Sequence, residues 1–344
     1  MKLDLERSTL RLAEPLQTSY GAVEEREILT VALTDEHGLT GYGEAAPLEA
    51  YDGVGSAHVR RALESYAPIL AAAGREANGA QLIEECRRED DLPTAFAAID
   101  LALWDLAGRR RGLPVAALLS DTPAALVPVN ATLTALDRAG VAEQAARAVA
   151  EGFGCIKLKV GLGDDAGRVA AARAAAGPEV ALRLDANGAW SVDQAVRAID
   201  ALAPAGLELV EEPTHGLHAV RAVRERVAAR IAIDETSAEA GALGAGVADA
   251  VCLKISRCGG IAGLLVAATL VRTSGAEVYL ASTLDGPLGV AAALHAAAAL
   301  ASRGPMPHCG LATLALFDDF EDPLPAHEGA IALPTGPGLG VEPL

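Results

Sequence analysis

Two lysines lie two residues apart within an apolar segment, CIKLKVG, at residues 155–161. If this segment is a β-strand, Lys157 and Lys159 point to the same face, because strand side chains alternate between two faces. Burying two ammonium groups is costly unless nearby anions or a chemical role offset their charge. The pair therefore indicates a charged site within an otherwise apolar strand.

Charged residues also end the apolar segments that follow. These segments end in Asp185, Glu211, Asp234 and Lys254, in that order. The acids are hard oxygen ligands without a nearby His or Cys, a set that favours Mg²⁺, or Mn²⁺, over zinc. We therefore expect Asp185, Glu211 and Asp234 to bind such an ion.

The lysines and the acids together can perform proton abstraction. A lysine near a divalent cation and a second ammonium in a dry site has a lowered pKa and can act as a base near neutral pH. It can then remove the proton alpha to a substrate carboxylate, with the metal stabilising the enediolate. One alternative is a salt-bridge network that only stabilises a non-catalytic barrel.

The elements that carry these residues repeat along the chain. Short apolar runs, separated by Ala-rich helical stretches, predict alternating strands and helices and so a parallel sheet. Seven runs and an eighth near residues 305–311 predict an α/β fold of the (β/α)8 type, in which the active site lies at the carboxyl ends of the strands. A doubly wound open sheet is the structural alternative. The seven runs begin at about residues 126, 154, 180, 207, 230, 250 and 277.

The segment before the barrel has a different pattern. Residues 27–47 predict a hairpin with its turn at His37 and Gly38, and residues 55–112 have helical patterning. We expect an α+β capping domain at 1–120, a catalytic barrel at 121–324, and a tail at 325–344 that packs on the capping domain.

The overall composition excludes several classes of partner. The formal net charge of −18 disfavours nucleic acid, and no apolar stretch is long enough to predict a membrane span. Five scattered cysteines and the absence of a signal-peptide pattern favour a cytoplasmic location. We expect a small-molecule carboxylate as the partner; the sequence leaves open whether the chain forms a homo-oligomer.

The ordered motifs GYGEAAPLEAYDG, KLKVG, RLDANGAW, LVEEP, DET and LKISRCGG resemble the muconate-lactonizing-enzyme subgroup of the enolase superfamily. This resemblance covers nearly the whole chain. It implies that Asp185, Glu211 and Asp234 are the metal ligands and that Lys159 is the acid/base on one face. It also implies that Lys254 lies on the other face and that Lys157 supports the substrate carboxylate.

Two other classes of barrel fit less well. An amidohydrolase would have an HxH motif at the first strand, where this chain has VPVNATL, and a mandelate-racemase-type enzyme would have a catalytic His after the seventh strand. His308 lies near the expected eighth strand, where a lone His is more often a structural or substrate-contact residue than a base.

Within the subgroup, three stretches resemble o-succinylbenzoate synthases of the menaquinone pathway: VPVNATL, STLDGPLGVAAALHAAAAL and HCGLATLALFDDFEDP. The last of these lacks the Asp-x-Asp of dipeptide epimerases at the eighth strand. We therefore expect a dehydration that gives o-succinylbenzoate. The alternatives are a dipeptide epimerase, an N-acylamino-acid racemase or a muconate-type cycloisomerase.

Substrate contacts are expected from the strand ends and from the capping domain. Residues 15–21 and 49–55 have the small and aromatic residues of a lid, and we expect them to close the mouth of the barrel. The expected substrate-binding residues are Tyr20, Asn130, Asn187, Ser282 and Asp285.

Overall fold

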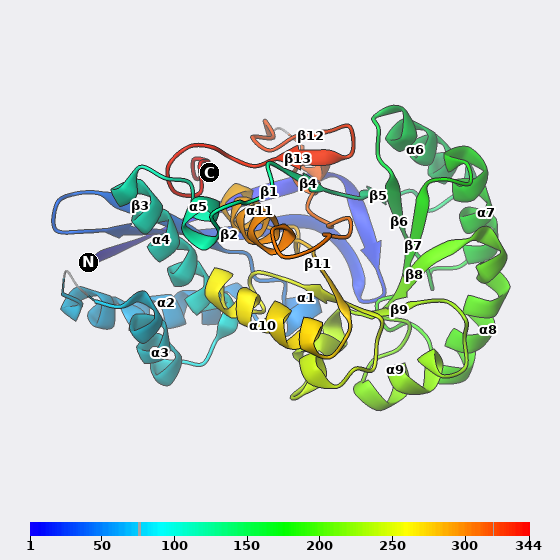
Figure 1. The fold of residues 1–344 in the computed structure, drawn as a ribbon, viewed down its shortest axis with the longest axis horizontal. Helices are drawn as coiled ribbons and strands as arrows, with labels where there is room; N and C mark the ends of the chain where they lie inside the picture. Colours follow the sequence, from blue (N-terminus) through cyan, green and yellow to red (C-terminus); the bar gives the residue numbers. More distant parts are fainter. Residues whose placement is uncertain (75–76, 319) are drawn as a thin grey trace.

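The chain begins with an antiparallel sheet of three strands, β1 (Lys2–Thr18), β2 (Gly21–Thr34) and β3 (Thr40–Ala45). In the computed structural model, which describes residues 1–344 apart from 75, 76 and 319, β2 pairs with both β1 and β3. The hairpin predicted around His37 and Gly38 is confirmed. Figure 1 shows β3 and the N-terminus at one end of the molecule, with the long strands β1 and β2 extending from there toward the barrel.

In the part of the chain that the structure describes, four helices complete the capping region. They are α1 (Glu49–Asp52), α2 (Ser56–Ala72), α3 (Gly79–Glu89) and α4 (Pro93–Arg111). Helix α4 lies directly on β3, where a Cβ atom at Gly41 or Gly43 would come within 2.4 or 2.1 Å of a carbonyl oxygen of the helix. The GYG sequence of β3 therefore permits this close packing, which fixes α4 against the sheet.

A parallel sheet follows, with its seven strands hydrogen-bonded in the order of the sequence. Its strands are β5 (Ala131–Leu133), β6 (Cys155–Lys159), β7 (Ala181–Asp185), β8 (Leu207–Glu211), β9 (Ile231–Ile233), β10 (Ala250–Leu253) and β11 (Glu277–Leu280). The alternation of apolar runs with helical stretches thus predicted the parallel sheet correctly.

The sheet curls into a barrel that a short segment closes. Cys309 forms a parallel bridge with Val129, and Gly310 forms one with Ala281, just after β11. The segment therefore lies between the last and first strands, in the place of an eighth strand. This arrangement is the (β/α)8-type barrel with a capping domain that the sequence predicts.

Helices cover the outside of the barrel (Figure 1). They are α6 (Arg138–Ala150), α7 (Asp165–Ala176), α8 (Val192–Leu202), α9 (Leu217–Arg224), α10 (Ile261–Thr273) and α11 (Pro287–Ala301), with α5 (Val115–Leu119) before the barrel. Outward strand residues such as Leu158 and Leu184 are fully buried in the core beneath these helices. Short 3-10 segments also lie in the connections, namely Ala203–Ala205, Glu235–Ala238, Ala242–Gly244 and Leu314–Leu316.

A separate cluster of side chains fills the inside of the barrel. It contains four small residues and two larger ones, Leu209 and Tyr279; the small ones are Ala232, Ala250, Cys252 and Ala281. Layers of inward side chains normally fill such barrels. The alanines leave room here for larger polar side chains from neighbouring strands.

The C-terminal tail contacts both parts of the molecule. Strands β12 (Ala326–His327) and β13 (Ala330–Ala332) form a small sheet with β4 (Leu126–Pro128), at the start of the barrel. Further along, the backbone N–H of Leu339 donates to Asp105 of α4. The division at residue 120 and the assignment of the tail to the capping domain stay predictions.

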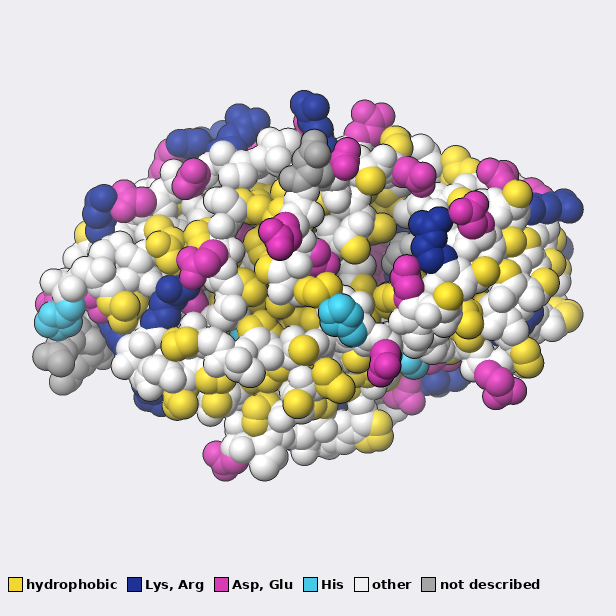
Figure 2. Space-filling view, turned by 90° about the horizontal axis from the view of Figure 1, so that it is seen from above, with side chains coloured by type: hydrophobic (Ala, Val, Ile, Leu, Met, Phe, Trp, Pro, Cys, Tyr) yellow, Lys and Arg dark blue, Asp and Glu magenta, His cyan; other side chains and the backbone are white. Residues whose placement is uncertain are grey.

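The surface agrees with the acidic composition of the chain. Acidic and basic side chains are interspersed on the face shown in Figure 2, where the basic ones do not gather into one patch. Within the described residues, the helices are too short or too polar to cross a lipid bilayer.

Candidate functional site

The charged residues predicted from the sequence meet at one end of the barrel. Lys159 pairs directly with Asp185 in the sheet register, and Asp185 pairs with Glu211, so that these three side chains are cross-strand neighbours. Asp234 and Lys254 come directly after β9 and β10. The carboxyl ends of parallel strands thus bring the predicted set together.

The acids and lysines of this set form short ion pairs. The ammonium group of Lys157 lies 2.9 Å from Asp185 and 2.8 Å from Glu211. Lys159 lies 2.7 Å from Asp185, and Lys254 lies 2.6 Å from Asp234. Each carboxylate is at most 2% exposed. Three lysines therefore balance the charge of three buried acids.

This balance shifts the ionisation of the buried groups. Burial opposes the charged form of Asp185, but Lys157 and Lys159 outweigh it and hold the pKa of Asp185 well below its usual range. For Lys254, burial is outweighed by the charge of Asp234 and by Tyr51, which raise the pKa. The lowered lysine pKa expected beside a divalent cation stays a prediction.

The donor set fits a divalent cation. Oxygen atoms of Glu211 and Asp234 lie within 4.8 Å of each other and of the sulfur of Cys252, and Asp185 adjoins Glu211 in the register. Buried carboxylates are ligands that Mg²⁺ and Mn²⁺ prefer. Because the three lysines already offset the acids, a bound cation would add two positive charges that an anionic substrate can match.

Residues around this set form a supporting layer. Asn187 accepts a hydrogen bond from Lys159 and donates one of 3.0 Å to Glu235. Glu212 is fully buried and accepts hydrogen bonds from the backbone N–H groups of Asp234 and Thr236. It therefore holds the segment after β9 in place from behind the strand end.

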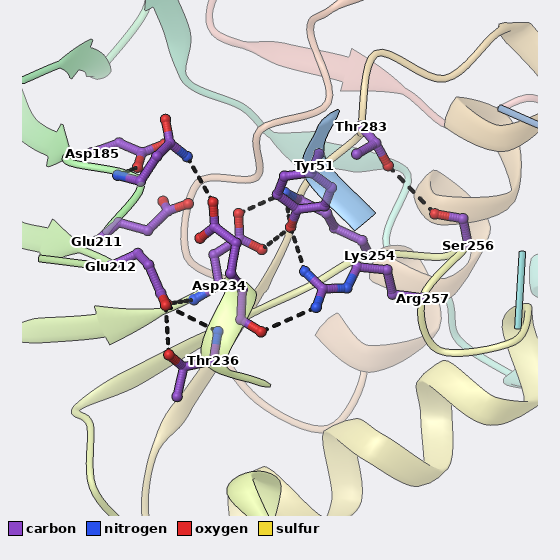
Figure 3. A network of polar contacts seen from close by, with 12 residues as sticks. Tyr51, Asp185, Glu211, Glu212, Asp234, Thr236, Lys254, Ser256, Arg257 and Thr283 are labelled. Carbon is purple, nitrogen blue, oxygen red and sulfur yellow. Dashed lines mark hydrogen bonds and ion pairs between the residues drawn. The ribbon is translucent and has the colours of Figure 1, made fainter. Parts of the chain in front are cut away.

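A residue of the capping region completes the site (Figure 3). The hydroxyl of Tyr51 donates to Asp234 and accepts from Lys254 and Arg257, each at 2.7 Å. The ammonium of Lys254 also lies 4.1 Å from the centre of the Tyr51 ring, in a cation–π contact. Sequence reasoning placed Tyr51 in a lid segment but did not identify these contacts, and it did not single out Arg257.

A small cavity of about 80 Å³ joins the barrel end to the capping region. Lys157, Lys159 and Lys254 all line it, together with Tyr20 and Tyr51. The rest of the wall is largely apolar and includes Leu16, Val23, Leu48, Leu284 and Leu316. In the described part of the chain, the carboxylates that line this cavity belong to Asp185 and Asp234.

The predicted substrate contacts fall into two groups. Tyr20, Asn187 and Ser282 line the cavity. Asn130 and Asp285 do not: both are buried behind the wall, where Asp285 accepts a hydrogen bond from the backbone N–H of Thr283. A role of these two residues in substrate binding stays a prediction.

His308 lies at the opposite end of the barrel. Its carbonyl oxygen accepts a hydrogen bond of 2.6 Å from Arg183, and its ring lies near Gly154, just before β6 begins. The structure therefore does not bring His308 to the mouth near the lysines.

This fold and site define a barrel enzyme of the enolase type. Residues 140–344 match the family described as "Enolase C-terminal domain-like", and residues 4–120 match "Mandelate racemase / muconate lactonizing enzyme, N-terminal domain". The chain belongs to the enolase superfamily, in its muconate-lactonizing-enzyme subgroup.

Known relatives within this group carry out different reactions. The chain is 32% identical over 303 residues to a hydrophobic dipeptide epimerase of Enterococcus faecalis, covering 85% of each chain. It is 40% identical over 216 residues to an o-succinylbenzoate synthase of Thermobifida fusca, covering 58% of this chain and 65% of that protein. A crystal structure of the Enterococcus epimerase with Mg and the dipeptide L-Leu-L-Tyr superimposes with a TM-score of 0.89 at 30% identity, over 98% of both chains.

The chain is thus similar to epimerases, racemases and cycloisomerases of this superfamily. The sequence analysis expects an o-succinylbenzoate synthase and gives a dipeptide epimerase as an alternative. The comparisons support the epimerase at least as well as the synthase. The sequence lacks the HxH motif of amidohydrolases and the catalytic His of mandelate-racemase-type enzymes, which agrees with this similarity.

Proposed function

We propose that the protein epimerises or racemises an N-acylated α-amino acid, such as a dipeptide, at the carbon next to the carboxylate. The observation that carries this proposal is the placement of two lysines. Lys159 extends from β6 and Lys254 follows β10, with three strands between them in the sheet. Both line the same cavity, so that a substrate between them would have an amine on each side.

Inversion at carbon needs one acid and one base on opposite faces. Lys159, in its neutral form, would accept the α-proton, so that the C–H bond breaks and an N–H bond forms. Lys254, in its ammonium form, would donate a proton to the other face of the same carbon. For the opposite enantiomer the two roles exchange.

The acids of the site have a separate role in this proposal. Asp185, Glu211 and Asp234 would hold a divalent cation, with Mg²⁺ as the first candidate. When bound, the cation supplies positive charge that stabilises the negative charge developing on the substrate carboxylate. Lys157 bridges Asp185 and Glu211, which keeps the two carboxylates together and adds positive charge beneath the substrate.

The lining and the volume of the cavity limit the chemistry and the size of the substrates that can bind. Apolar residues from the capping region and from the loop after β11 surround the two lysines, which suits an apolar side chain on the amino acid. At about 80 Å³ the cavity is smaller than the 300–1,000 Å³ typical of ligand pockets. The segments that carry Tyr20 and Tyr51 would therefore move outward when the substrate enters.

A second candidate is synthesis of o-succinylbenzoate. Among the residues that the structure describes, those near Gly310 and Thr313 that line the cavity have no carboxylate to hold the ammonium group of a dipeptide. This feature, together with the identity to the Thermobifida synthase, favours an uncharged ring. In that reaction Lys159 would act alone as base and acid, and Lys254 would contribute only charge.

The experiment that tests the proposal is proton exchange in D₂O. The full chain with Mg²⁺ would be incubated with N-acetyl-L-leucine, L-Ala-L-Leu, L-Leu-L-Tyr and the cyclohexadiene carboxylate precursor of o-succinylbenzoate. Loss of the α-proton signal in NMR, with formation of the D-configured product, supports epimerisation. Dehydration of the cyclohexadiene without exchange of any amino-acid derivative would transfer the assignment to the synthase.

A further inference from the structure

The carboxylate of Glu211 has a second partner besides Lys157, on the side away from the capping region. The hydroxyl of Tyr279 donates a hydrogen bond of 2.7 Å to its Oε2 atom. Tyr279 belongs to β11, and its side chain points into the barrel, where it is only 2% exposed. A proposed metal ligand is thus contacted from inside the barrel by a residue that does not line the cavity.

Arg183 fixes the position of the Tyr279 ring. The guanidinium carbon of Arg183 lies 4.9 Å from the ring centre, in a cation–π contact. Arg183 is itself held by hydrogen bonds to Glu208, at 2.7 and 3.0 Å, and to the carbonyl of His308. Arg183 therefore supports the ring from the closed end of the barrel.

A local irregularity of the sheet allows this support. The register between β7 and β8 shifts after Leu182, so that Leu182 pairs with Leu207 but Arg183 pairs with Leu209. Glu208 is the extra residue of this bulge, and its carboxylate reaches Arg183. Bulges commonly redirect a side chain in this way.

Tyr279 also has the chemistry of a donor. A tyrosine hydroxyl ordinarily keeps its proton near neutral pH, and the 2.7 Å contact places it as a donor to the carboxylate of Glu211. A protonated phenol that donates to Oε2 fixes the orientation of the carboxylate. Partners of this kind typically change metal affinity by about 10–100-fold when they are removed.

We propose that Tyr279 is a positioning residue of the metal site, which acts by orienting Glu211. This inference rests on the metal ligands of the proposed function. A plain packing role for the ring is the alternative, and it makes a different prediction for Tyr279→Phe, because phenylalanine keeps the ring and loses only the hydroxyl.

The test is a titration of the full chain with Mn²⁺, in which the EPR signal of free Mn²⁺ measures how much has bound. Tyr279→Phe should weaken binding about tenfold, with thermal unfolding close to that of the wild type. The matched control is Tyr66→Phe, which removes the hydroxyl of another buried tyrosine, one that donates to the carbonyl of Asp90 in the capping region. It should leave Mn²⁺ affinity within about twofold of the wild type.

A double-mutant cycle shows whether Tyr279→Phe changes Mn²⁺ affinity through Glu211 or through a general change in the protein. In a Glu211→Gln background, where binding is already weak, Tyr279→Phe should add little further loss. Equal losses in both backgrounds, or wild-type affinity in the single variant, would overturn the role of Tyr279. If the wild-type protein itself binds no Mn²⁺, the metal site of the proposed function fails instead.

If Tyr279→Phe does not fold, Glu208→Gln provides the same test, because it weakens the support of Arg183 at a partly exposed position and leaves the hydroxyl in place. A measurable loss of Mn²⁺ affinity would support the positioning role, and unchanged affinity would oppose it.

Discussion

The hydroxyl of Tyr51 donates a hydrogen bond to Oδ1 of Asp234, which joins the capping region to a proposed metal ligand of the barrel. The same hydroxyl accepts a hydrogen bond from Lys254, the proposed acid/base of one face. A single side chain of the capping region therefore contacts both kinds of group on which the proposed reaction depends (Figure 3).

This relationship predicts a catalytic defect for Tyr51→Phe. Hydrogen bonds to charged groups are worth about 1.5–3 kcal/mol, so that kcat should fall about tenfold or more while the ring still packs against Tyr20. Steady-state kinetics at saturating Mg²⁺ would measure the change, with Tyr66→Phe as the control. An unchanged kcat would show that the hydroxyl has no part in the reaction.

Removal of the metal should abolish activity. After treatment with EDTA and desalting, turnover should be lost, and added Mg²⁺ or Mn²⁺ should restore it. Asp185→Asn should reduce the restored activity at any practical Mg²⁺ concentration, because it removes a negative charge from a carboxylate that is 1% exposed. Full activity after rigorous chelation would contradict a metal-dependent reaction.

Tyr20 should affect substrate choice more than stability. Its ring lies 5.8 Å from that of Tyr51 and lines the cavity, whereas the adjacent Ser19 holds the turn through a hydrogen bond to the carbonyl of Asn187. Tyr20→Ala should shift kcat/KM toward substrates with larger side chains. If only the melting temperature changes, the residue is not part of a lid.

Much of the site could be predicted from the sequence because strand periodicity determines faces. Residues two apart on a strand share a face, and parallel strands bring their carboxyl ends to one side of the sheet. These two rules place Lys157, Lys159 and Asp185 at one end of the sheet, and the register of β6 and β7 agrees with this placement. The same rules placed the apolar neighbours Leu158 and Leu184 beneath the helices.

The rest depends on packing that such rules do not describe. Tyr51 reaches Asp234 only because the capping region lies over the barrel end, a relation between segments 183 residues apart. Tyr279 looks like an ordinary strand residue, and its contact with Glu211 follows from the space that small neighbours leave inside the barrel. Asp285 lies in the loop after β11, which ends at Leu280, and strand periodicity does not determine the direction of a side chain there.

A buried histidine makes stability depend on pH. The Nδ1 atom of His295 accepts from the backbone N–H of Ala116, and its Nε2 donates to the carbonyl of Leu339. Burial lowers its pKa from 6.5 to about 4. The unfolded chain therefore binds a proton more readily than the folded one. The contribution of His295 to the free energy of unfolding is complete above pH 6.5. It decreases by about 3 kcal/mol as the pH falls toward 4.

Urea unfolding between pH 7 and pH 4.5 would measure this loss. His295→Asn, which cannot titrate, should show a shallower fall in the free energy of unfolding than the wild type. The matched control is His218→Asn at an exposed position of α9, which should keep the wild-type slope. Equal slopes for all three proteins would contradict the contribution of His295.

The central claim is that two lysines act on opposite faces of one carbon. The most direct measurement is α-proton exchange in D₂O with each enantiomer of the substrate, for Lys159→Ala and Lys254→Ala, each checked for an intact fold. Each variant should lose racemisation by at least about 10²-fold, yet still exchange the α-proton of one enantiomer, a different one for each lysine. Racemisation that survives either substitution, or exchange of the same enantiomer by both variants, would contradict the account.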